Sequence, residues 1–67
     1  MNKIIANRIY SRRLELGLSQ QELAQALGTT QTAVSRYESG DRTPSIGFLR
    51  LLAQQLKLSL AELLEGK

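Results

Sequence analysis

The chain has 67 residues and a formal net charge of +3, with nine Lys and Arg against six Asp and Glu. This length allows one domain, spanning residues 1–67, with a small core. Because the sequence contains neither Cys nor His, it lacks disulfides, thiolate metal sites and the commonest general base of enzymes. We therefore expect no enzymatic activity, metal, other cofactor or small-molecule ligand. The basic balance favours an anionic partner, and nucleic acid first.

Hydropathy gives no sign of a membrane segment. No apolar run approaches the roughly 18 residues that a transmembrane helix requires. The apolar stretch near the start is too short for a signal peptide, and Arg8 interrupts it. We therefore expect a cytoplasmic protein with no membrane partner.

The first predicted element is a helix over about residues 4–16. Its apolar residues recur at three- and four-residue spacing, which is typical of one side of a helix. They are Ile5, Ile9 and Leu16, with Ala6, Tyr10 and Leu14 alongside. Gly17 follows directly and ends the helix, as a C-terminal glycine commonly does.

Two further helices follow in close succession. Ser19 and Glu22 have the spacing of a capping box, which predicts the start of the second helix, and Gly28 ends it. Thr30 is the expected N-cap of a third helix that extends to about Glu38. Few residues of this third helix are apolar and inward-facing: Val34 and Tyr37.

The remaining segment predicts two more helices. Thr43 is the expected N-cap of the fourth helix, with Pro44 at its first position. Its apolar stripe consists of Ile46, Leu49, Leu52, Ala53 and Leu56. Ser59 and Glu62 form a second capping box, which begins the fifth helix. The sequence therefore predicts a compact all-α domain of five short helices.

The second and third helices are joined by a turn of only three residues, 28–30. A turn this tight sends the next helix off at a steep angle, which is the geometry of a helix-turn-helix over about residues 19–38. Close approach of the two helices requires the small Ala24, the turning Gly28 and the space-filling Val34. The alternative interpretation is an ordinary hairpin of two helices in a bundle.

Four segments together resemble the XRE/Cro/CI family. They are residues 17–24, residues 28–31, residues 35–40 and the pair Pro44-Ser45. The resemblance extends from the first helix to Leu64 and is closest to the N-terminal domains of lambdoid phage repressors of the 434 type, which share Gly-Thr-Thr-Gln at the turn. It implies a lambda-repressor-like fold of five helices with the third in the major groove.

The resemblance also implies which residues contact DNA. The expected base contacts are Gln31, Thr32, Arg36, Thr30 and Ser35. The expected phosphate contacts are Gln20, Ser19, Arg13, Ser39 and Arg42. Gln31 would read adenine in a bidentate manner, braced by Gln20, and Arg13 would form an ion pair with Glu38.

Arg36 departs from the 434 pattern, which has Gln at this position. Arginine is the common reader of guanine, but it also binds phosphate, and both roles stay open. Three other basic residues, Lys3, Arg8 and Arg12, are interpreted as a solvated face.

The predicted function is sequence-specific binding of double-stranded DNA by a transcriptional regulator, most simply a repressor. Family members bind palindromic operators as dimers, and leucines near the end of the chain offer apolar surface for a homodimer. They are Leu58, Leu60, Leu63 and Leu64. Occupancy of the operator would block RNA polymerase, or contact it from an upstream site. The alternative is a protein-binding module, such as an antitoxin or adaptor.

Overall fold

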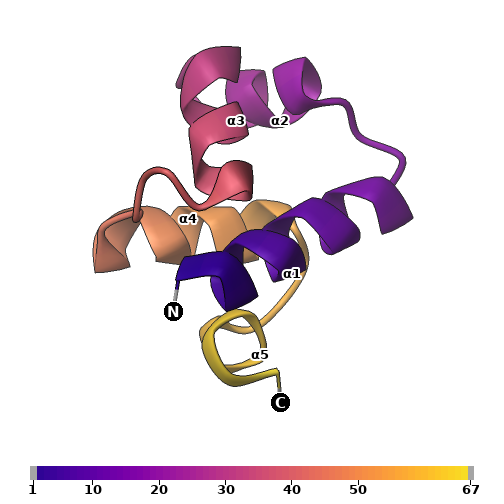
Figure 1. Ribbon diagram of the computed structural model, residues 1–67. Helices are drawn as coiled ribbons and strands as arrows, with labels where there is room; N and C mark the ends of the chain where they lie inside the picture. Colours follow the sequence, from indigo (N-terminus) through magenta and orange to yellow (C-terminus); the bar gives the residue numbers. More distant parts are fainter. Residues whose placement is uncertain (1, 67) are drawn as a thin grey trace.

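Five helices form the computed structural model, which describes residues 2–66 (Figure 1). They are α1 (Asn2–Glu15), α2 (Gln20–Leu27), α3 (Gln31–Ser39), α4 (Ile46–Gln55) and α5 (Leu60–Glu65). In Figure 1, α2 and α3 lie above α1 and α4, and α5 packs beneath them. The prediction of an all-α fold with five helices is confirmed. Among residues 2–66, none of the helices has the length and apolar character needed to cross a membrane.

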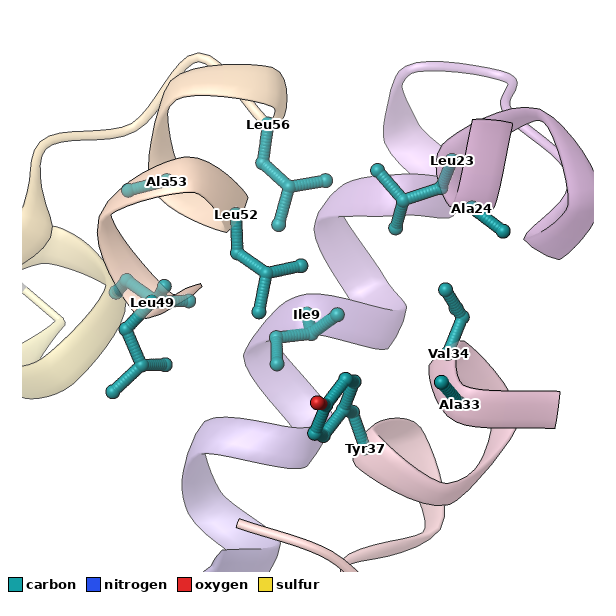
Figure 2. Close-up of a cluster of buried hydrophobic side chains, with 11 residues drawn as sticks. Ile9, Leu23, Ala24, Ala33, Val34, Tyr37, Leu49, Leu52, Ala53 and Leu56 are labelled. Atoms are coloured by element: carbon teal, nitrogen blue, oxygen red, sulfur yellow. The ribbon is translucent and has the colours of Figure 1, made fainter. Parts of the chain in front are cut away.

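One apolar core joins all five helices. Its fully buried large side chains are Ile9, Leu23, Val34, Leu52, Leu56 and Leu63. Figure 2 shows that side chains from α1, α2, α3 and α4 converge on a common centre. Because burial of one large aliphatic side chain stabilises a fold by about 1.5–3 kcal/mol, these six residues dominate the stability of so small a domain.

The helix caps form where the local sequence predicts them. The Ser19 hydroxyl accepts a hydrogen bond from the Glu22 N–H (3.0 Å), and the Glu22 carboxylate accepts one from the Ser19 N–H (2.8 Å). Ser59 and Glu62 form the same reciprocal pair at α5. The hydrogen bond from the Ser59 N–H holds the pKa of Glu62 below its usual range. Gly28 ends α2 in the left-handed conformation, with φ of 70°.

The predicted start of the fourth helix is wrong by two residues. Ser45, not Thr43, is the N-cap, and its hydroxyl accepts a hydrogen bond from the Phe48 N–H (3.2 Å). Pro44 is buried in the preceding loop instead of occupying the first helical position. Ile46 takes that position and is 57% exposed, so it lies outside the apolar stripe. Both Thr43 and Ser45 carry a hydroxyl suited to capping, and the residue between them, Pro44, is buried.

We expect Ser45→Ala to lower the free energy of unfolding by about 1 kcal/mol, because the first turn of α4 loses its acceptor. Thr43→Ala is the matched control and is expected to change stability by less than about 0.5 kcal/mol, since Thr43 is exposed. Urea denaturation of the two variants measures both values. A larger loss for Thr43→Ala than for Ser45→Ala would contradict the observed cap.

Two side chains of α1 that the sequence places on the apolar side are instead exposed. Tyr10 is 46% exposed and Leu14 is 51% exposed, whereas Ile9 and Ala6 are buried. The helix α1 packs against α3 and α5, and a helix of this diameter buries only a narrow stripe against them. The apolar side of α1 is therefore narrower than predicted.

Two of the three basic residues interpreted as a solvated face, Arg8 and Arg12, differ from the prediction. Lys3 is exposed, as expected. Arg8 donates a hydrogen bond to the Leu63 carbonyl (3.2 Å), and Arg12 donates one to the Leu56 carbonyl (2.9 Å). A cation at the C-terminal end of a helix satisfies carbonyls that have no partner within the helix. Arg8 and Arg12 therefore hold α1 to the ends of α5 and α4 and do not form a solvated face.

Candidate nucleic-acid interface

The turn between α2 and α3 fixes the relative position of these two helices. The Thr29 N–H donates to the Ala24 carbonyl (2.9 Å), and Gly28 adopts the left-handed conformation that the turn requires. Ala24 is 2% exposed and Val34 is 1% exposed. The small side chain on α2 and the buried valine on α3 thus lie in the core beneath the turn, as a helix-turn-helix requires.

The outer face of α3 gathers polar side chains. Within α3, Ala33, Val34 and Tyr37 are buried and turn inward. The exposed residues between them join the half-buried Gln20 of α2 around a surface hollow of about 310 Å³. Its lining residues are Gln20, Gln31, Thr32, Ser35 and Arg36. Five of the ten predicted DNA contacts are therefore brought together in one place.

Two further predicted contacts, Ser19 and Thr30, stand at the starts of α2 and α3 as N-caps. The Thr30 hydroxyl accepts a hydrogen bond from the Ala33 N–H (3.1 Å), as the Ser19 hydroxyl does from Glu22. A hydroxyl that accepts in this way keeps its own O–H free to donate. Capping therefore leaves both residues able to donate to a phosphate or a base.

Arg13 and Glu38 form a buried ion pair beneath the hollow. Arg13 Nε lies 2.6 Å from Glu38 Oε2, and Arg13 Nη2 lies 3.1 Å from Glu38 Oε1. The two side chains are 7% and 4% exposed. Arg13 Nη1 also donates to the Leu18 carbonyl (2.7 Å). The hydrogen bond to Glu38 raises the pKa of Arg13 above its ordinary value, so Arg13 stays charged. Because all three guanidinium nitrogens of Arg13 already donate to partners within the domain, few of its N–H groups remain for a phosphate.

Gln20 belongs to the same network. Its Nε2 donates a hydrogen bond to Glu38 Oε1 (3.0 Å), so its partner in this structure is Glu38 and not Gln31. This contact between α2 and α3 is not among those predicted from the sequence. The signal that could have found it is the ion pair itself, since a carboxylate held by one arginine keeps lone pairs for a further donor.

The loop after α3 holds the last two predicted phosphate contacts. The Ser39 hydroxyl donates to the Arg36 carbonyl (3.1 Å) and accepts from the Asp41 N–H (3.3 Å). The guanidinium of Arg42 lies 5.5 Å from the centre of the Tyr37 ring, which is within the range of a cation–π contact. Tyr37 in turn packs on Phe48, with ring centres 5.2 Å apart. An aromatic support for Arg42 was not predicted, because Tyr37 was considered only as a core residue.

A family model described as a helix-turn-helix, HTH_3, matches residues 9–63 of the chain. The chain belongs to the HTH_3 family. This HTH_3 domain is of the XRE/Cro/CI type and has the lambda-repressor-like fold. The resemblance stated from the sequence is thereby confirmed, and the family is one of non-enzymatic DNA-binding regulators.

Solved structures and a curated relative agree with this membership. The P22 c2 repressor in complex with a synthetic operator superposes with a TM-score of 0.87 and 30% identity, over 94% of this chain and 96% of that one. SinR in complex with DNA gives 0.84 and 35%, over 91% and 98%. An uncharacterised HTH-type transcriptional regulator from Rickettsia conorii is 35% identical over 66 residues. That alignment includes 98% of this chain but only 53% of the relative, so the chain spans about half of the relative's length.

Proposed function

We propose that this HTH_3 domain binds a palindromic operator in double-stranded DNA as a homodimer and acts as a repressor, with α3 in the major groove. The observation that carries the proposal is the polar hollow of α2 and α3, lined by Gln20, Gln31, Thr32, Ser35 and Arg36. These side chains carry the donors and acceptors that base edges require. The similarity to the P22 c2 repressor with its operator supports the same conclusion.

Each residue has a role that follows from its chemistry. Gln31 offers an amide that donates to N7 and accepts from N6 of adenine, and Arg36 offers a fork that fits guanine O6 and N7 or a phosphate. The hydroxyls of Thr30, Thr32 and Ser35 donate to base edges. Contacts to the DNA backbone come from Ser19, Gln20 and Arg42, and from any N–H of Arg13 that its internal partners leave free. Ser39 joins them only by exchanging its hydrogen bond to the Arg36 carbonyl for one to a phosphate. Phosphate contacts set the register of α3, and base contacts set the sequence.

A dimer follows from the size of the reading surface. One recognition helix covers a few base pairs, so two copies related by a two-fold axis are needed to select an operator. The C-terminal leucines contribute less to this than the sequence suggests: Leu63 is buried, and Leu58, Leu60 and Leu64 pack against the core. We therefore propose a dimer that is stabilised by DNA, in which occupancy of the operator excludes RNA polymerase.

The protein-binding alternative has no support on α3. A groove for a protein partner would present exposed aromatic or leucine side chains, whereas the exposed side chains of α3 are Gln, Thr, Ser and Arg. The exposed large apolar side chains, including Tyr10, Leu14 and Leu51, lie on α1 and α4. We therefore favour DNA over a protein as the partner of α3.

The proposal is tested by selection of binding sites from random duplex DNA, followed by Gln31→Ala and Arg36→Ala. We expect a palindromic site in which Gln31→Ala abolishes discrimination at one position of each half-site, at a cost of about 1–3 kcal/mol. The same loss at a second position assigns Arg36 to guanine, and a uniform loss across sequences assigns it to phosphate. Gln54→Ala, on the exposed side of α4, is the matched control and should bind as the unaltered domain does. Failure to enrich any sequence at low salt would overturn the proposal.

A further inference from the structure

We propose that Glu38 is a positioning residue for base reading: it fixes the amide orientation of Gln20, and through Gln20 that of Gln31. This inference rests on the proposed function and deepens it. Glu38 lies near the C-terminal end of α3, and its side chain is buried against Arg13. It is not among the residues proposed to contact DNA. Its effect on DNA is therefore indirect and separable from its effect on folding.

The first step is the geometry at Glu38. An ionised carboxylate only accepts hydrogen bonds, so the Gln20 amide must turn its NH₂ group toward Glu38 Oε1, at 3.0 Å. The carboxylate cannot rotate to release Gln20, because Arg13 holds both of its oxygens at 2.6 and 3.1 Å. Its side chain is only 4% exposed, so water does not compete for this place.

The second step concerns the other arm of the same amide. The amide group is planar, so with its NH₂ on Glu38 the Gln20 carbonyl oxygen faces away from the carboxylate. Gln20 and Gln31 line the same hollow, and in this proposal the Gln20 oxygen accepts a hydrogen bond from one amide N–H of Gln31. Acceptance from one N–H of Gln31 leaves the second N–H and the oxygen of Gln31 for adenine N7 and N6.

The third step is the consequence for specificity. A glutamine that is free to turn its amide by 180° presents donor and acceptor in either order, and it discriminates poorly between bases. Gln31 held by an oriented Gln20 presents one order only, which is the order that adenine requires. Because Gln31 is already oriented in the free domain, its side chain loses less conformational entropy when the domain binds DNA.

The sharpest variant is Glu38→Gln. The single oxygen of the glutamine introduced at position 38 is expected to stay with Arg13 Nε, the closer partner. The NH₂ group of that glutamine then faces Gln20, so the Gln20 amide must invert to present its oxygen. We expect discrimination at the base pair read by Gln31 to fall by about fivefold to 150-fold, the equivalent of one bidentate contact. Glu15→Gln makes the same chemical change on an exposed carboxylate of α1 and is expected to keep the specificity profile.

Two more variants keep the proposal falsifiable if Glu38→Gln folds poorly. The paired replacement of Arg13→Met with Glu38→Leu removes the charges together, which commonly preserves folding. Gln20→Ala leaves the ion pair of Arg13 and Glu38 intact and removes the link to Gln31 together with the proposed phosphate contact of Gln20, which affects all sequences equally. Both are expected to lose discrimination at the Gln31 position by the same factor, without further loss when combined. Binding to single-base variants of the selected site gives these values, and circular dichroism checks folding.

The outcomes separate this inference from the proposed function. If the unaltered domain selects no sequence, the proposed function fails. If it selects an operator but folded Gln20→Ala or the paired variant keeps the full profile at the Gln31 position, the positioning role of Glu38 is overturned. A uniform loss of affinity with unchanged discrimination at the Gln31 position would also overturn it, because that result marks a phosphate contact only.

Discussion

Glu38→Ala is expected to lower the free energy of unfolding by about 3–5 kcal/mol, because it leaves Arg13 charged and without its partner in the core. The loss includes the hydrogen bonds from Arg13 and from Gln20 to the carboxylate. A domain of this length has a total stability of about 3–10 kcal/mol, so this loss removes a large fraction of it. Urea denaturation followed by circular dichroism measures the change.

Two controls accompany this prediction. Glu15→Ala removes an exposed ion pair in which Glu15 Oε1 lies 3.4 Å from Arg12 Nη1. It should lower the free energy of unfolding by less than about 1 kcal/mol. The paired apolar replacement of Arg13 and Glu38 should recover most of the stability lost by Glu38→Ala. A cost for Glu38→Ala as small as that for Glu15→Ala would contradict a buried, mutually dependent pair.

Leu52→Ala is expected to cost about 2–5 kcal/mol, because it leaves a cavity at the centre of the core. Leu52 has no exposed surface, and Figure 2 shows it beside Ile9 of α1, between Leu49 and Leu56. In a domain of this size the loss corresponds to a fall in Tm on the order of 10–30 °C. Thermal unfolding followed by circular dichroism provides the measurement.

The neighbouring leucine provides a matched control for that variant. Leu51 precedes Leu52 on the same helix but is 47% exposed. Leu51→Ala removes the same atoms from the surface and is expected to cost less than about 1 kcal/mol, since alanine also favours the helix. Equal effects of the two substitutions would contradict the orientation of α4.

Features encoded within a few residues could be predicted from the sequence. Capping boxes and helix-ending glycines depend on partners three or four positions apart, so Ser19, Ser59 and Gly28 were assigned correctly. The period of a helix likewise predicts that Gln31, Thr32, Ser35 and Arg36 share one side of α3. The start of α4 was missed because two hydroxyls compete locally, and only tertiary packing chooses between them.

Contacts between distant residues could not be predicted in this way. Arg12 and Leu56 are 44 positions apart, and Arg8 and Leu63 are 55 positions apart, yet each pair forms a hydrogen bond. No local pattern distinguishes these arginines from solvated ones. The bond from Gln20 to Glu38, 18 positions away, has the same character, so the polar hollow was predicted but its internal support was not.

The attachment of α5 to α1 has a consequence for how the chain reaches its native state. α5 has six residues, too few to be helical on its own, and it brings the fully buried Leu63 into the core. The helix therefore forms as it docks, and the Arg8 side chain of α1 stabilises it in the docked position. On the ribosome, completion of the core must wait until residues 60–65 have emerged. Cooperative folding of this domain is then an event that follows translation of its last helix, however early α2 and α3 assemble.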